Sequence, residues 1–223
     1  MDRALLVTKD GSHTVIMPSL NVTYHSMHGA VQESKHVFID AGLNYQWSVK
    51  NDPTISVLEV GFGTGLNALL TCSEAASRQR KISYTALEPY PLTAEITKGL
   101  NYEDASGYLA MIHNAVWGAA VNIHEYFRLT KLKISLAEAD AEGKYDLVYF
   151  DAFDPGTQPA IWSAESFEKI YSMMKPGGVL TTYCSKSHVR KTMMSVGFKV
   201  TKIQGPRGKR EMVRAERRLD QSE

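Results

Sequence analysis

The chain has 223 residues, of which 43% are hydrophobic and 22% are charged, and its formal net charge is +1. These values are typical of a globular α/β protein with one main domain, and no apolar run approaches the roughly 18 residues that a membrane-spanning helix needs. The N-terminus becomes charged too early for a secretory signal peptide, and Cys72 and Cys184 provide neither a metal-binding spacing nor a disulfide framework, so we expect a cytoplasmic protein without a metal site.

The first 50 residues are expected to form an extension that packs on the main domain. Two β-rich runs, at 5–8 and 14–16, flank a turn containing Asp10-Gly11 and predict a β-hairpin over residues 4–17. The mixed segment 29–47 predicts a helix that is broken near Gly42. Because Asp52-Pro53 is a typical boundary signal, we assign residues 1–50 to the extension and 51–223 to the core domain.

Within the core domain, predicted strands alternate with predicted helices. The strands are expected at 55–60, 82–87, 127–136, 145–150, 179–183, 198–203 and 211–215. The helices are expected at 66–77, 93–100, 105–116, 163–174 and 187–196, and Ser163 is the expected N-cap of the fourth. This alternation predicts a Rossmann-like, mostly parallel seven-stranded sheet covered on both faces, with an antiparallel last strand because the connection before it is too short for a crossover helix.

The most informative motif is Glu59-x-Gly61-x-Gly63-x-Gly65, which follows a buried strand and precedes an apolar helix. Glycines at such a turn let the backbone approach a nucleoside closely. The spacing differs from the dinucleotide-binding pattern, whose third glycine lies one position later. We interpret the motif as the S-adenosyl-L-methionine (SAM) loop of a class I methyltransferase, with a dinucleotide site and a simple tight turn as the alternatives.

Acidic residues end three of the predicted strands, at Glu59, Glu88 and Asp151, where ligands of open parallel sheets bind. Glu88 is placed to accept hydrogen bonds from both ribose hydroxyls, although it could instead cap the helix that follows Pro89. Asp140, in a later loop, is a candidate for contacting the adenine amino group or a solvated turn residue.

The segment 151–155, Asp-Ala-Phe-Asp-Pro, follows the strand that should lie beneath the cofactor methyl group. It resembles the Asp-Pro-Pro-Tyr type motif of amine methyltransferases in position and chemistry. An amine nucleophile needs a carboxylate to orient it and to receive its proton, and Phe153 can stack on a planar base. The sequence therefore predicts Asp151 as the catalytic carboxylate, unless it only caps a turn.

The C-terminal part of the chain is basic, with eleven lysines and arginines against four acidic residues from Lys186 onward. Lys186, Arg190 and Lys191 fall on one predicted helix, and Lys209 and Arg210 lie in the last loop. These side chains form either a phosphate-binding edge for a polyanionic partner or a solvated basic surface.

The chain also resembles the MnmC family of tRNA wobble-uridine methyltransferases, in its stand-alone, MnmD-type form. The similarity extends over nearly the whole chain, and its most specific parts are the Asp-x-Phe-x-Pro block with Trp162 and the Gly-Lys-Arg-Glu-Met loop. The similar segments are 24–26, 33–39, 42–44, 61–67, 146–155, 158–162, 175–178, 189–191, 196–198 and 208–212.

The resemblance implies SAM-dependent N-methylation of 5-aminomethyluridine, or its 2-thio form, to 5-methylaminomethyluridine at the tRNA wobble position. It implies Asp151 as the catalytic carboxylate, and in the mechanism that we expect, the flipped base stacks near Phe153. The residues that it places around the cofactor are Gly61, Gly63, Gly65, Asn67, Glu88, Tyr24 and Glu33.

The implied partner is the anticodon arm of tRNA, and a separate enzyme must supply the aminomethyl group, since we expect no flavin oxidoreductase domain in this chain. Asp154 departs from the family pattern, where many relatives carry alanine. The alternatives from other classes are a small-amine methyltransferase, a polyamine aminopropyltransferase and a non-catalytic tRNA-binding partner.

Overall fold

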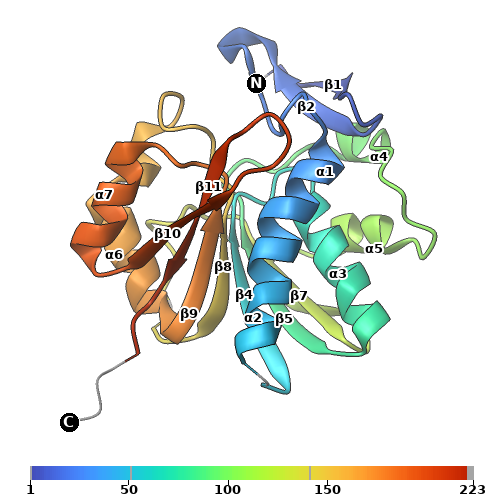
Figure 1. Cartoon of the computed structure of the whole chain (residues 1–223). Helices are drawn as coiled ribbons and strands as arrows, with labels where there is room; N and C mark the ends of the chain where they lie inside the picture. Colours follow the sequence, from blue (N-terminus) through green and yellow to red (C-terminus); the bar gives the residue numbers. More distant parts are fainter. Residues whose placement is uncertain (1, 51, 141, 220–223) are drawn as a thin grey trace.

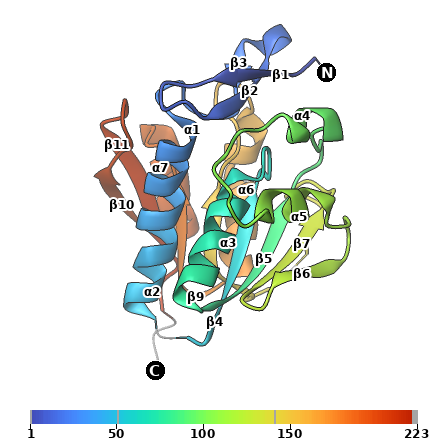
Figure 2. The same cartoon turned by 90° about the vertical axis from the view of Figure 1, so that its right-hand side faces the viewer.

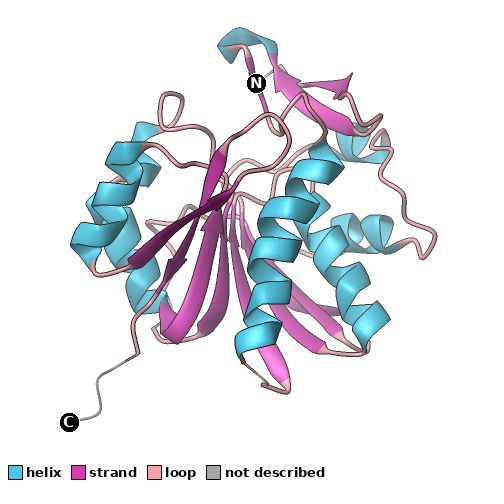
Figure 3. Cartoon of the chain, viewed as in Figure 1, coloured by secondary structure: helices cyan, strands magenta, loops and turns pink. Residues whose placement is uncertain are grey.

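The computed structural model describes residues 2–50, 52–140 and 142–219. Its central sheet contains the strands β4 (Thr54–Val60), β5 (Lys81–Leu87), β6 (Ala120–His124), β7 (Phe127–Leu132), β8 (Tyr145–Phe150), β9 (Met174–Thr182), β10 (Lys199–Gln204) and β11 (Glu211–Glu216). These eight strands lie in the order β10-β11-β9-β8-β4-β5-β7-β6 (Figures 1 and 3).

The middle of the sheet is parallel, because β4 pairs with β5 and β8, β5 pairs with β7, and β8 pairs with β9 in that sense. The antiparallel last strand is confirmed: β11 lies between β9 and β10 and is antiparallel to both. The expected count of seven strands is wrong, since β6 adds an antiparallel edge strand beside β7. Only Ile123 of β6 is fully buried, so this strand carries little hydrophobic signal.

The predicted N-terminal hairpin is confirmed. Strand β1 (Ala4–Val7) pairs antiparallel with β2 (His13–Met17). A short 3₁₀ turn at Pro18–Leu20 then leads to a third strand, β3 (Val22–Thr23), which also pairs with β2. Figure 1 shows this small sheet above the edge at which the central parallel strands end, so the extension covers the part of the fold where ligands bind.

The helix predicted in the extension is continuous, and the expected break at Gly42 is wrong. It runs through α1 (Ala30–Ser34), a π-helical segment (Lys35–Asn44) and α2 (Tyr45–Val49). A Cβ on Gly42 would lie 3.1 Å from the Tyr149 ring and 3.2 Å from Thr181 Oγ1. The glycine therefore serves close packing of this long helix against β8 and β9.

Helices cover both faces of the sheet (Figures 1 and 2). The long helix, α3 (Leu66–Arg78) and α5 (Tyr108–Asn114) cover one face, and α6 (Ala164–Met173) and α7 (Ser187–Val196) cover the other. The short α4 (Ala94–Lys98) precedes α5, and a 3₁₀ turn (Pro159–Trp162) precedes α6, whose predicted N-cap is confirmed by the hydrogen bond from Ser166 N to Ser163 Oγ.

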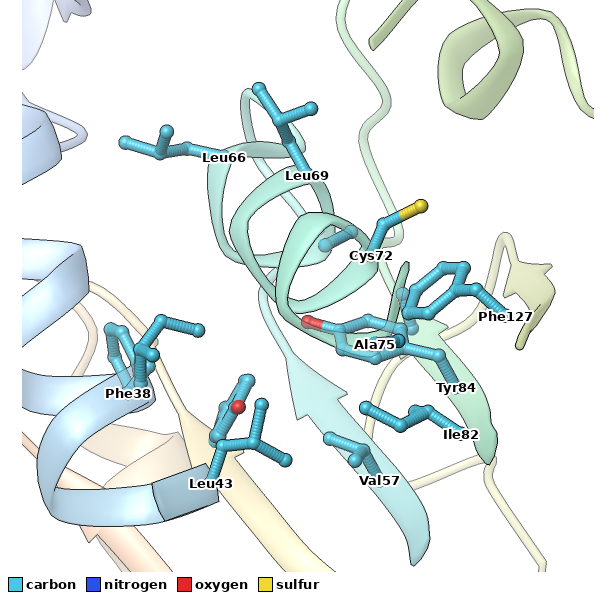
Figure 4. Packing of buried hydrophobic residues seen from close by; sticks show 14 of the residues in the cluster. Phe38, Leu43, Val57, Leu66, Leu69, Cys72, Ala75, Ile82, Tyr84 and Phe127 are labelled. Carbon is cyan, nitrogen blue, oxygen red and sulfur yellow. The ribbon is translucent and has the colours of Figure 1, made fainter. Parts of the chain in front are cut away.

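The buried core on the first face joins the long helix to α3 and the strands beneath them. Figure 4 shows Phe38 and Leu43 on one side, Leu66 and Cys72 from α3 opposite, and Tyr84 of β5 between the elements. This packing fixes the start of α3 and the loop before it. None of the helices in the described part of the chain combines the length and the apolar character needed to cross a membrane.

Candidate active site

A cavity of about 420 Å³ lies at the carboxyl ends of β4, β5 and β8. Its walls come from the glycine loop after β4, residues 87–90 at the end of β5, residues 134–136 after β7, and the segment that follows β8. The N-terminal extension contributes residues 22–26 and Glu33, and the C-terminal part contributes Tyr183 and Lys209. Its size is within the range of small-molecule sites.

The glycine loop is shaped by two close approaches. Gly61 has φ +94°, and a Cβ there would lie 2.6 Å from the carbonyl oxygen of Asp151. Gly63 has φ +51°, and a Cβ there would lie 3.1 Å from the Tyr24 ring. Gly65, which precedes the first residue of α3, lies outside the cavity wall and packs against Phe62 and His113.

Glu88 is held by the backbone at the end of β5. Its Oε2 accepts a hydrogen bond from Gly63 N at 3.1 Å, and its Oε1 accepts one from Tyr90 N at 2.9 Å. Each carboxylate oxygen keeps further acceptor capacity for a hydroxyl group. The alternative role as a helix cap is wrong, because Thr93 is the N-cap of α4. A ribose diol fits this arrangement, with Gly63 and Glu88 as the residues that would hold it.

Asp151 lies beside the glycine loop and lines the same cavity. Its Oδ2 accepts a hydrogen bond from Asn67 Nδ2 at 2.8 Å, and the same nitrogen donates to Glu59 Oε1 at 3.0 Å. Burial raises the pKa of Asp151 to about 7, although the Asn67 hydrogen bond acts in the opposite direction. A carboxyl group with this pKa can take up and release a proton near neutral pH.

The segment that carries Asp151 is anchored at three consecutive residues. Asp151 N donates to the carbonyl of Val60 at 3.0 Å. The Tyr183 hydroxyl donates to the carbonyl of Ala152, and Trp162 Nε1 donates to that of Phe153, each at 2.8 Å. Rigid anchoring of this kind fixes the direction of the carboxylate and of the neighbouring aromatic ring.

Aromatic side chains from distant parts of the chain meet at the cavity. The rings of Tyr24 and Phe153 lie edge to face, with centroids 5.1 Å apart and an interplanar angle of 89°. Both residues line the cavity together with the exposed Tyr90. Such rings offer apolar surface for a planar base.

Lys209 reaches the cavity from the loop between β10 and β11. Its Nζ lies 2.8 Å from Glu33 Oε1 and 3.9 Å from the centroid of the Tyr183 ring. Glu33 is in turn fixed by a hydrogen bond from Ser26 N at 2.8 Å. The ammonium group, which the sequence suggested as a phosphate ligand, is therefore engaged inside the site.

The remaining predicted residues lie at or beyond the rim. Asp140 is exposed and does not line the cavity. Lys186 pairs with the cavity-lining Asp154 at 2.8 Å, and both side chains are about half exposed. Arg190 is partly buried on α7, whereas Lys191 and Arg210 are exposed.

Sequence reasoning gave no role to Glu59, Tyr183 or Tyr90. The sequence places Glu59 at a ligand-binding strand end, two residues before the first glycine, but its side chain is fully buried and does not line the cavity. No local pattern marks Tyr183, since its contact with Ala152 depends on the pairing of β8 with β9.

A parallel sheet with a glycine loop and two carboxylates at the carboxyl ends of its strands is typical of nucleoside-binding α/β proteins. Residues 109–218 match the family described as S-adenosyl-L-methionine-dependent methyltransferase. Over this segment the chain is similar to SAM-dependent methyltransferases, and it is an enzyme that uses SAM.

Two relatives are each named "tRNA 5-methylaminomethyl-2-thiouridine biosynthesis bifunctional protein MnmC". The protein of Leptospira interrogans is 29% identical over 93% of this chain and 34% of its own length. That of an Acidovorax species is 28% identical over 91% of this chain and 34% of its own length. The chain therefore spans about a third of the length of these relatives.

Solved structures show the same fold. MNMC2 from Aquifex aeolicus superposes with a TM-score of 0.82 and 23% identity, covering 98% of this chain and 72% of that one. Spermidine synthase from Thermotoga maritima superposes with a TM-score of 0.55 and 12% identity, covering 97% of this chain and 73% of that one.

Proposed function

We propose that this enzyme N-methylates the aminomethyl group of 5-aminomethyluridine, or of its 2-thio form, at the wobble position of tRNA. The product is 5-methylaminomethyluridine. The observation that carries the proposal is the carboxyl group of Asp151, which faces the cavity beside the glycine loop with a pKa of about 7. The relatives named for biosynthesis of a 5-methylaminomethyl nucleoside support the choice of amine.

The chain's own residues supply positioning and a proton acceptor. Gly63 and Glu88 hold the ribose of the cofactor, which when bound provides an electrophilic methyl group. The aminomethyl group must react as the neutral amine, because an ammonium group has no free electron pair. Asp151 hydrogen-bonds this amine, directs its lone pair and takes up the proton released as the new N–C bond forms.

The tRNA is proposed to enter from the side of the aromatic residues. Phe153 and Tyr24 contact the flipped wobble base, and basic residues at the rim bind the phosphates of the anticodon arm. These rim residues are Lys186, Arg190, Lys191 and Arg210. We further propose that the reaction takes place in the cytoplasm and that a separate enzyme installs the aminomethyl group.

The test is transfer of labelled methyl from SAM to tRNA that carries 5-aminomethyluridine, followed by nucleoside analysis. Conversion to 5-methylaminomethyluridine is the expected result. Asp151→Ala should lower the transfer rate by about 100- to 10,000-fold while SAM binding is retained, since a general base contributes this much. Equal loss of binding would instead make Asp151 a cofactor ligand.

A parallel reaction with decarboxylated SAM and a diamine tests for aminopropyl transfer. The similarity to spermidine synthase concerns the fold alone, and a basic rim disfavours a polycationic substrate. Product from the diamine, without conversion of the tRNA nucleoside, would replace the proposed function with that activity.

A further inference from the structure

Two carboxyl groups share one amide in the floor of the site. The side-chain nitrogen of Asn67 donates to Glu59 Oε1 and to Asp151 Oδ2, at 3.0 and 2.8 Å. Asn67 is 3% exposed and Glu59 is fully buried. The three side chains thus run from the interior, at the end of β4, to the cavity, at the end of β8.

Among the residues that the structure describes, none of the cations forms an ion pair with Glu59. Four neighbouring titratable groups either shift the pKa of Glu59 or have their own pKa shifted by it. These groups are the carboxyl groups of Asp151 and Glu88 and the hydroxyls of Tyr84 and Tyr149. The Asn67 amide and the Tyr84 hydroxyl lower the pKa of the Glu59 carboxyl group, but they do not offset the effect of burial.

Asp146 is a second buried carboxyl group in this fold, and unlike Glu59 it is paired with lysines. Its side chain is 1% exposed, yet Lys175 Nζ lies 2.8 Å from Oδ2 and Lys50 Nζ lies 3.8 Å from Oδ1. Ser56 N donates to the same carboxylate at 2.9 Å. In the described part of the chain, Glu59 has neither a lysine partner nor a backbone donor. An isolated charge is far more costly to bury than a neutral carboxyl group.

The two carboxyl groups therefore differ in protonation. Burial, and then the neighbouring Asp151, raise the pKa of Glu59 well above its ordinary value. For Asp151, burial and Glu33 raise the pKa, whereas Asn67 and Lys209 lower it. Asp151 is the member of the pair that loses its proton first as the pH increases.

We propose that Glu59 is held as a neutral acid beneath the active site and that Asn67 couples it to Asp151, so that Asp151 carries the only negative charge of the pair. This assignment rests on the proposed function insofar as Asp151 serves the amine. Asn67 occupies Oδ2 of Asp151 and leaves Oδ1 for the substrate. The proton lost by the methylated amine moves to Asp151 and then to solvent, while Glu59 keeps its proton throughout.

Asn67 is then a positioning residue rather than a ligand of the cofactor. The alternative, that its amide binds SAM directly, would require the nitrogen to leave both carboxyl groups. These two roles give different results when Asn67 is changed, because one affects the rate and the pH dependence and the other affects binding.

The first experiment is infrared spectroscopy of the free enzyme at pH 8. A carbonyl stretch of a buried protonated carboxyl group should be present in the wild type, absent in Glu59→Gln and retained in Asp151→Asn. Absence of the band in the wild type would overturn the proposal. Because no substrate is present, the result does not depend on whether tRNA is the methyl acceptor.

The second experiment is the pH dependence of methyl transfer. Asn67→Ala should lower kcat by about 10- to 100-fold, the value of a hydrogen bond to a charged group, and move the half-maximal pH upward, with SAM affinity measured by calorimetry unchanged. Glu59→Gln should leave the half-maximal pH in place. A downward shift in Glu59→Gln would show that Glu59 is charged, and lost SAM affinity in Asn67→Ala would show a cofactor ligand.

Discussion

Asp151 combines two properties at the scale of a single residue: it reaches a cavity, and it is buried enough for its pKa to lie near 7. Its place at a strand end could be predicted from the sequence, since the apolar run of β8 stops there. Its pKa could not, because the shift comes first from burial in the folded chain and then from Asn67, Glu33 and Lys209, which only the fold brings together. The rate of methyl transfer should therefore increase with pH through about 7.

The same pKa predicts how stability depends on pH. The pKa of Asp151 is higher in the native state than in the unfolded chain, so the native state favours the protonated carboxyl group. The contribution of this group to the free energy of unfolding is fully present below pH 3.8 and is lost as the pH rises through about 7. Asp151→Asn should consequently increase the free energy of unfolding at pH 8, by up to about 4 kcal/mol. Below pH 4 the variant and the wild type should unfold at similar denaturant concentrations.

Chemical denaturation at both pH values checks this prediction. Asp140→Asn is the control, because it removes a carboxyl group that is exposed and outside the cavity. An equal increase in stability for both variants, or an increase in Asp151→Asn at pH 4 as well, would contradict the assignment of the effect to the carboxyl group in the cavity.

At the scale of elements, the site depends on how closely two loops pass each other. The loop after β4 and the segment after β8 touch at Gly61, where a Cβ would overlap the Asp151 carbonyl. The sequence predicted these glycines from nucleoside binding, whereas the structure shows that Gly61 accommodates protein backbone. Gly42 in the long helix is a second example. The sequence predicted a helix break there, whereas the structure shows that the glycine allows close packing against another element.

Gly61→Ala should therefore damage both stability and activity. Gly118 is a matched control, with φ +83° against +94° for Gly61 and nothing within 4 Å of an added Cβ. Gly118→Ala should lower stability by about 1 to 2 kcal/mol, the cost of a left-handed alanine. Gly61→Ala must also displace the Asp151 backbone, so we expect a larger loss of stability and a lower kcat, measured by denaturation and methyl transfer.

Similar stability for the two alanine variants would show that the loops separate without strain. A stable Gly61→Ala variant that no longer binds SAM would instead support the original interpretation, in which the glycine makes room for the ligand. Calorimetric titration of folded Gly61→Ala protein with SAM measures whether binding is retained and so distinguishes these two explanations.

At the scale of the whole molecule, the N-terminal extension and the loop between β10 and β11 meet at the cavity. Glu33 belongs to the extension and Lys209 to the last loop, and 176 positions separate them in the sequence. The α/β order of the elements could be predicted, because hydrophobic runs and turn residues are local signals. Contacts such as Glu33–Lys209 could not, since they arise only once the sheet order and the path of the long helix are set.

This ion pair places opposite charges near one carboxyl group, so its two members should act on Asp151 in opposite directions. Lys209 lowers the pKa of Asp151 and Glu33 raises it. Lys209→Met should move the half-maximal pH of methyl transfer upward, and Glu33→Gln should move it downward, each by on the order of one unit. The double variant should lie between them, because both contributions are removed.

Lys186→Met separates this effect from tRNA binding. Lys186 pairs with Asp154 at the rim and is not among the groups that shift the pKa of Asp151. Whatever its effect on the KM for tRNA, its half-maximal pH should match that of the wild type. If the half-maximal pH shifted in the same direction in Lys209→Met and Glu33→Gln, the effect would not come from the charges of the pair. The ion pair would then act by holding the extension and the last loop together and keeping the cavity closed.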